Sequence, residues 1–263
     1  MRRVVFNQKG GVGKSTITCN LAAINAAMGK RTLVIDLDPQ GNSTRYLLGE
    51  NPIDSKETLV GFFKEILTYS FRSKGAAGYI HQTPFKNLAL MAAHQELDEQ
   101  QSKLESRYKM FKLRDALLEL EGYDDIYIDT PPALNFFTRS ALIAANACLI
   151  PFDCDDFSRQ ALYTLLDNVR EIQQDHNNQL IIEGIVVNQF QSRARLPRAL
   201  VDELIGEGLP ILDAYLSPSV RIRESHQSAQ PMVHFDPQHK LTGEFQALYR
   251  AIDERAGAQV QAV

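Results

Sequence analysis

A glycine-rich segment between an apolar run and a helical pattern constrains this chain more than any other feature. The apolar run covers residues 3–7, the segment reads KGGVGKST over residues 9–16, and apolar residues then recur at helical spacing over 15–28. The glycines let successive backbone N–H groups converge on an anion, and a helix N-terminus adds partial positive charge. The segment therefore predicts a phosphate-binding loop.

The polar side chains of this loop have separate predicted roles. Lys14 would reach the β- and γ-phosphates of a nucleotide, and the Ser15 hydroxyl would bind Mg²⁺. The pattern G-x-x-x-x-G-K-[ST] fails at one position, where Gln8 stands in place of the first glycine. Lys9 is a second cation, which is either a solvated charge or a group that reaches a phosphate bound in another subunit. The predicted nucleotide-binding residues of the loop are Lys9, Gly10, Gly11, Val12, Gly13, Lys14, Ser15 and Thr16.

Apolar segments alternate with helical patterns along the chain. Strands as apolar as TLVIDL at 32–37 are typical of a parallel sheet that is covered on both faces. We therefore expect an α/β fold with a mostly parallel twisted sheet and helices on both faces. The predicted strands lie at 3–7, 32–37, 125–129, 147–152 and 180–188, and the predicted helices at 15–28, 97–121, 138–145, 158–175, 198–206 and 241–255.

The length of 263 residues fits one large domain over 1–263. Residues 49–87 are the least regular part and hold a helical core around 59–67, so we expect an insertion or lid over the sheet edge. The tail at 256–263 is small and polar and is expected to fray.

Composition excludes several classes of protein. The 28 Lys and Arg residues and 32 Asp and Glu residues give a net charge of −4, so any anion-binding face must be local. Cys19, Cys148 and Cys154 form no C-x-x-C pair, which argues against a disulfide scaffold, an iron–sulfur site or a zinc ribbon. No apolar run resembles a signal peptide or reaches 18 residues. We therefore expect a cytoplasmic protein.

Polar residues stand where predicted strands end. Asp36 and Asp38 are two residues apart and can face one crevice, where carboxylates hold hydrated Mg²⁺ or orient water. The alternative is turn chemistry before Pro39. The same two interpretations apply to Asp129, and Asn188 could simply be a polar residue at a strand end.

Five segments, the phosphate loop among them, give the chain a family resemblance. Residues 7–16 (NQKGGVGKST) resemble the deviant Walker A loop of ParA/MinD-type ATPases, and residues 36–42 (DLDPQGN) resemble the ParA switch I segment. Residues 123–132 (YDDIYIDTPP) resemble its Walker B and switch II segments, while 186–190 and 220–231 resemble later motifs. The resemblance covers most of the chain and is weakest at 49–87. It implies a P-loop NTPase fold with a deviant Walker A loop.

The resemblance also implies roles for single residues. Lys9 is similar to the signature lysine that crosses an ATP-sandwich dimer, Asp38 to the residue that positions the attacking water, and Asn188 to the residue that reads adenine. Asp36 would support the metal through water, and Asp129 matches the Walker B carboxylate. The implied catalytic residues are Lys9, Lys14 and Asp38, and the implied metal site is Ser15, Asp36 and Asp129.

Such a family member would be a Mg²⁺-dependent ATPase, slow without a partner, that forms a homodimer with ATP. It would partition or position plasmid DNA, chromosomal DNA or a protein cargo, with a ParB-like or other protein stimulating hydrolysis. Clustered arginines are either solvated charge or a surface for nonspecific DNA in a nucleoid-associated protein. In similar ParA proteins, arginines aligned with Arg193 and Arg221 form that surface. The candidate DNA-binding residues are Arg193, Arg195, Arg198, Arg221 and Arg223.

Two alternative functions come from other classes. A MinD-like membrane-cycling regulator would need a basic amphipathic helix, which residues 253–263 do not provide. An ATP-dependent ligase or synthetase, such as a dethiobiotin synthetase-like or cobyrinate-amidating enzyme, would need a small-molecule site, and the sequence shows no nucleophilic cysteine with a paired histidine to feed ammonia.

Other residues carry weaker signals. The spacing of His226, His234 and His239 fits no common metal site. The acidic run at 153–156 is better interpreted as a solvated loop than as a metal site. Phe136 and Phe137 belong either to the core or to a switch II contact, and the sequence does not distinguish the two.

Overall fold

The computed structural model describes residues 1–68, 73–154 and 159–261, and within them seven strands form one sheet. The strand order is β3-β4-β2-β5-β1-β6-β7. β3 pairs antiparallel with β4, and the other neighbouring strands pair in parallel. The predicted mostly parallel sheet is therefore confirmed. The strands are β1 (Arg2–Val5), β2 (Thr32–Asp36), β3 (Ile80–Gln82), β4 (Leu88–Met91), β5 (Asp125–Asp129), β6 (Ala147–Asp153) and β7 (Ile181–Asn188).

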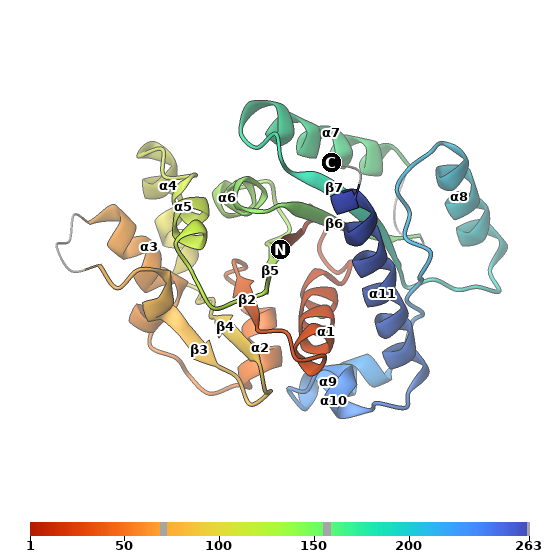
Figure 1. Ribbon diagram of the computed structural model, residues 1–263, viewed down its shortest axis with the longest axis horizontal. Coiled ribbons are helices and arrows are strands. Elements are labelled where there is room, and N and C mark those ends of the chain that lie inside the picture. Colours follow the sequence, from red (N-terminus) through yellow and green to blue (C-terminus); the bar gives the residue numbers. More distant parts are fainter. Residues whose placement is uncertain (69–72, 155–158, 262–263) are drawn as a thin grey trace.

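Helices cover both faces of the sheet. Figure 1 shows α6 and α7 on one side of the strands and α1 and α11 on the other. The helices are α1 (Lys14–Ala27), α2 (Asn42–Leu48), α3 (Leu59–Leu67), α4 (Leu97–Ser106), α5 (Lys112–Leu118), α6 (Phe136–Ala144), α7 (Arg159–Asp175), α8 (Arg195–Gly206), α9 (Arg221–Gln227), α10 (Met232–Phe235) and α11 (Lys240–Gln261). Residues 155, 156 and 158, which belong to the predicted acidic run and helix start, lie outside the described part.

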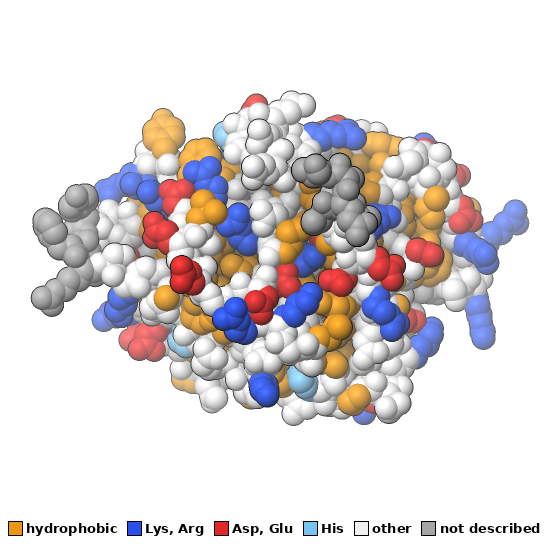
Figure 2. All heavy atoms as spheres, in the orientation of Figure 1, with side chains coloured by type: hydrophobic (Ala, Val, Ile, Leu, Met, Phe, Trp, Pro, Cys, Tyr) orange, Lys and Arg blue, Asp and Glu red, His pale blue; other side chains and the backbone are white. Residues whose placement is uncertain are grey.

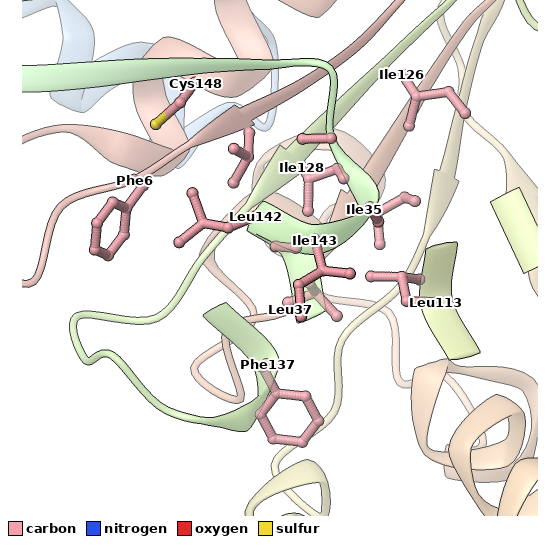
Figure 3. Close-up of a cluster of buried hydrophobic side chains, with 14 of the residues drawn as sticks. Phe6, Ile35, Leu37, Leu113, Ile126, Ile128, Phe137, Leu142, Ile143 and Cys148 are labelled. Carbon is pink, nitrogen blue, oxygen red and sulfur yellow. The ribbon is translucent and has the colours of Figure 1, made fainter. Parts of the chain in front are cut away.

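Alternating side chains of the strands build a separate apolar cluster on each face. Ile126 and Ile128 point to the face covered by α5 and α6, where they meet Leu113, Leu142 and Ile143 (Figure 3). Tyr127, between them in sequence, points to the opposite face, which α1 and α11 cover. Phe136 and Phe137 are both buried in the first cluster, so the question that the sequence left open is decided in favour of the core.

The helix predicted over 97–121 is wrong as a single element, because the chain breaks between α4 and α5. Tyr108 adopts a positive φ of 53°, and the N–H of Lys109 bonds to the carbonyl of Leu104, 3.0 Å away. This is the Schellman geometry that ends helices, although a glycine normally occupies the left-handed position. Apolar residues keep their helical spacing on both sides, so periodicity did not reveal the break.

The 49–87 segment contributes to the main body. α3 occupies the expected 59–67 core, and its Phe62 and Phe63 side chains lie in the same apolar cluster as the strands. β3 pairs with β4 and forms the edge strand of the sheet. The sequence analysis predicted neither of these two strands. A lid movement of this segment stays a prediction. α11 continues past the expected end at 255, so the part of the tail up to Gln261 has helical backbone.

A buried ion cluster ties the strands together at the amino-terminal edge of the sheet. The Arg3 guanidinium donates to Glu183 on β7 at 2.9 Å and to Asp125 on β5 at 3.0 Å. Arg3, Asp125 and Glu183 are all buried. Asn25 of α1 donates to Asp125 at 3.1 Å and accepts from the Tyr249 hydroxyl of α11 at 2.7 Å. The cluster therefore joins the sheet to both helices of one face.

We expect Arg3→Met to lower the free energy of unfolding by about 3–5 kcal/mol, because it leaves the buried Glu183 without its cation and removes the nearest cation from Asp125. Urea unfolding measures the effect. Arg31→Met is the matched control, because Arg31 makes an exposed ion pair with Asp124 at the same edge, and exposed pairs contribute little. Equal losses in the two variants would contradict a structural role for the buried cluster.

Candidate active site

The carboxyl ends of β1, β5 and β2 meet at the opposite edge of the sheet. β5 lies between the other two strands, and the register places Asp129 beside Val5 of β1 and Asp36 of β2. The glycine-rich loop leaves β1 at this edge and enters α1 at Lys14. The topology therefore brings the predicted phosphate loop and the predicted acidic residues to one place, as expected for ligand sites of open α/β sheets.

The phosphate loop has the backbone that its glycines predict. Gly11 and Gly13 have φ values of 79° and 89°, which L side chains rarely adopt. A Cβ atom on Gly13 would lie 2.5 Å from Nδ2 of Asn188, so the loop also needs glycine there for space. Nothing lies within 4 Å of a Cβ atom built on Gly11. The loop is thus braced on one side and open on the other, which suits a phosphate-binding cradle.

Two buried carboxylates, Asp36 and Asp129, form the base of the site. Asp129 accepts from the Ser43 hydroxyl at 2.7 Å, and Asp36 accepts from both the N–H and the hydroxyl of Thr44 at 2.7 Å. Both are fully buried, and burial raises the pKa of Asp129 to about 6 and the pKa of Asp36 well above its usual range. A divalent cation would relieve this unfavourable burial of charge, so the donor set fits Mg²⁺.

Lys14 and Asp38 face the same site from the loop and from the end of β2. Lys14 Nζ donates to the carbonyl of Lys9 at 2.8 Å, and burial lowers the pKa of its ammonium despite the nearby Asp129 and Asp38. Burial likewise raises the pKa of Asp38, whose carboxylate accepts from the N–H of Gln40 at 3.0 Å. Both side chains line a cavity of about 300 Å³.

That cavity also contains residues that the sequence analysis did not assign to it. The described residues that line it are Gly10, Gly11, Gly13, Lys14, Ser15, Thr16, Asp38, Gln40, Asn42, Pro132 and His226. Gln40 and Asn42 already lie in the 36–42 segment that resembles switch I, but the sequence analysis gave them no role in the site. His226 comes from α9, within the 220–231 segment that resembles a later family motif, but the sequence analysis considered it only as a metal ligand.

Lys9 and Asn188 occupy other positions around the loop. Asn188, at the end of β7, donates through Nδ2 to the Val12 carbonyl at 3.0 Å and so braces the loop. Its implied adenine contact stays a prediction. Lys9 is not among the described residues that line the cavity, and its backbone N–H bonds to the Asn7 side chain at 2.9 Å.

The candidate DNA-binding arginines fall into two groups. Arg193, Arg195 and Arg198 lie at the start of α8 or just before it, are exposed, and make no ion pair within the described ranges. Lys and Arg side chains project from this end of the molecule (Figure 2). Arg221, by contrast, is paired with Glu224 at 2.5 Å and Asp236 at 2.9 Å and stacks over Phe235. Arg223 is exposed on the same helix.

Comparisons with known proteins agree with this geometry. A family model described as an AAA domain matches residues 3–182. The chromosome partitioning protein ParA of Myxococcus xanthus is 32% identical over 95% of this chain and 87% of its own. The chain belongs to the ParA-type partition ATPases. It is therefore an ATPase whose cofactors are ATP and Mg²⁺, as its motifs predicted.

Solved structures share the fold of this ParA-type chain. Apo McdA from Cyanothece is 21% identical, has a TM-score of 0.82 and aligns over 95% of this chain and 98% of its own. Cobyrinic acid a,c-diamide synthase from Mycobacterium smegmatis, solved with an ATP analogue and magnesium, is 25% identical. Its TM-score is 0.76, with 96% of this chain and 92% of the other aligned. The predicted P-loop NTPase fold is thus confirmed.

We expect Asp129→Asn to raise the melting temperature of the nucleotide-free protein at pH 7.5 by about 2–4 °C or more, a change that accompanies about 1 kcal/mol at this size. The pKa of Asp129 is about 6 when folded and about 4 when unfolded, so the folded state binds the proton more tightly. Its charge therefore destabilises the wild type increasingly as pH rises from about 4 to about 6. The difference between variant and wild type should accordingly shrink at pH 4.5.

Thermal scans at pH 7.5 and pH 4.5 measure this dependence. Asp167→Asn is the control, because Asp167 is an exposed carboxylate on α7, where loss of the charge should change little. An Asp129→Asn variant that melts at or below the wild-type temperature at pH 7.5 would show that the charge of Asp129 does not destabilise the folded protein.

Proposed function

We propose that this ParA-type ATPase is a nucleotide-dependent switch. It dimerises with ATP and binds nonspecific DNA in that state. When a partner protein stimulates ATP hydrolysis, the ATPase is released from the DNA. The task would be to partition plasmid or chromosomal DNA or to position a protein cargo, in the cytoplasm and on the nucleoid. The observation that carries the proposal is the convergence of Lys14, Asp38 and the Asp36–Asp129 pair at one end of the sheet.

Each group in this site has a definite chemical task in the proposal. Lys14 stabilises the charge on the β- and γ-phosphates, and Asp38 orients the attacking water. Ser15, Asp36 and Asp129 would hold Mg²⁺, whose charge neutralises the phosphate oxygens. Because Asp38 is the group assigned to the water, replacing it should block hydrolysis while nucleotide binding persists.

In this proposal, Lys9 acts across the interface of the ATP-bound dimer. Lys9 lies on the phosphate loop. However, it is not one of the described residues that line the nucleotide cavity of its own chain. A lysine so placed can serve a phosphate bound by a second copy of the chain, as an arginine finger does in trans. ATP would then join two subunits through their phosphate loops, and loss of the γ-phosphate would remove that bias.

Lys9→Ala in an Asp38→Ala background should remain monomeric with Mg²⁺ and ATP, whereas Asp38→Ala alone should dimerise. Light scattering coupled to size-exclusion chromatography measures the mass of each species. Lys103→Ala removes one exposed lysine from α4 and serves as the control. A Lys9→Ala protein that still dimerises with ATP would refute the role in trans.

In this proposal, Arg193, Arg195 and Arg198, the α8 arginines, bind the phosphates of DNA. Three exposed guanidinium groups without ion pairs in the described part form a local basic surface on a chain whose net charge is −4. Such a surface binds phosphates without reading bases, and its affinity falls steeply with salt. Arg221 would contribute only if its bonds to Glu224 and Asp236 open, so the α8 group carries the larger share.

Fluorescent nonspecific duplex DNA should bind the Asp38→Ala protein with ATP, and not with ADP or without nucleotide. Replacing Arg193, Arg195 and Arg198 together by alanine should weaken this binding. The slope of log K against log salt should fall by about 0.9 for each arginine that contacts a phosphate. Arg31→Ala, at the other edge of the sheet, is the control. Unchanged DNA binding in the triple variant would show that these arginines are solvated surface charges that do not contact DNA.

Two of the three described cysteines argue against the amidating alternative, and the third, Cys154, is half-buried. Cys19 and Cys148 are buried, and burial raises the pKa of both thiols, so neither is an activated nucleophile. In the described part of the chain, no helix is both long and apolar enough to span a bilayer. ATP-dependent binding to anionic vesicles, with no binding to DNA, would favour the MinD-like function.

A further inference from the structure

His226 lies in the nucleotide cavity, although its role is unassigned. It comes from α9, far along the chain from the phosphate loop, and its imidazole lines the cavity beside Thr16 and Ser15. Nε2 of His226 lies 3.0 Å from the hydroxyl oxygen of Thr16, within hydrogen-bond distance. The imidazole is therefore in direct contact with a residue of the loop that the proposed function assigns to the nucleotide.

The ring is held in place from behind by Tyr46 of α2. The two rings stack with centroids 3.8 Å apart and an interplanar angle of 17°. Tyr46 is itself fixed, because its hydroxyl lies 2.5 Å from Ser225 and accepts from Asn20 at 3.2 Å. Tyr46 and Ser225 are buried, so the stack is anchored in the body of the protein and the imidazole points to Thr16.

The contact between His226 and Thr16 has a preferred direction when a phosphate is present. Burial lowers the pKa of His226 to about 4, so in the nucleotide-free protein the ring is neutral at physiological pH and carries one N–H. Phosphate oxygens only accept hydrogen bonds. A Thr16 hydroxyl that donates to phosphate must therefore accept from its other neighbour, which requires the proton of the imidazole to be on Nε2. The resulting chain of hydrogen bonds strengthens each of its members.

We propose that His226 is a nucleotide-positioning residue, which donates Nε2–H to Thr16 and thereby turns the Thr16 hydroxyl proton toward the phosphate chain of bound ATP. This inference rests on the proposed assignment of the loop as the nucleotide site. It gives α9, the helix that also carries Arg221 and Arg223, a direct contact with that site.

The test measures binding of a fluorescent ATP analogue with Mg²⁺ to the full chain. His226→Phe keeps an aromatic ring on Tyr46 but has no donor, and its dissociation constant should rise roughly 2–12-fold, the effect of one hydrogen bond. His226→Gln restores an N–H donor and should bind within about twofold of the wild type. His234→Phe is the control, because His234 also stacks on a ring, that of Phe85, and does not line the cavity.

A double-mutant cycle with Thr16→Val separates this role from a structural one. If His226 acts through the Thr16 hydroxyl, the variant with both substitutions should bind ATP no more weakly than Thr16→Val alone. Additive losses, or wild-type affinity in His226→Phe, would overturn the proposal. Lys14→Ala tests the underlying site: if it leaves affinity unchanged, the loop assignment fails instead.

Nitrogen-15 NMR of the wild-type protein tests the tautomer without any substitution. With a non-hydrolysable ATP analogue and Mg²⁺, the signals of His226 should be those of a neutral ring protonated at Nε2. A ring protonated at Nδ1 in the nucleotide complex would contradict the proposal, whether or not the variants fold.

Discussion

The burial of Asp36 and Asp129 side by side is the constraint on which the rest of the site depends. Parallel pairing of β2 with β5 fixes the two carboxylates in register, and the fold buries both completely. Desolvation and mutual repulsion work against their charges, and hydrogen bonds from Ser43 and Thr44 offset only part of that cost. A site built this way would gain stability on binding a cation, which suits an ATPase of the ParA type.

The same hydrogen bonds connect the site to the helices around it. Ser43 and Thr44 belong to α2, which also supplies Tyr46, the residue that holds His226 of α9 in position. On the other side, Gln101 of α4 accepts from Asn135, whose side chain caps α6 after the switch II segment. Both carboxylates are therefore joined to α2 by direct hydrogen bonds. By contrast, the Arg3 cluster at the opposite edge joins β1 to β5 and β7.

Much of the fold followed from local patterns, and the exceptions have physical causes. Buried parallel strands and amphipathic helices leave clear periodicities, so β2, β5, β7 and α1 were predicted within a residue or two. β4 was missed because LALM has no β-branched residue and no alternation. The break between α4 and α5 was missed because Tyr108 occupies a left-handed position that usually holds glycine.

The sequence by itself determined the phosphate loop, its strand and helix, and the acidic residues that end β2 and β5. These depend on the conformational freedom of glycine and on residues close together in the chain, so they are legible without a fold. Tertiary structure alone decided which distant groups complete the site. Asn188 braces the loop across 176 residues and His226 meets Thr16 across 210, contacts that only the strand order and the packing of α9 on α2 create.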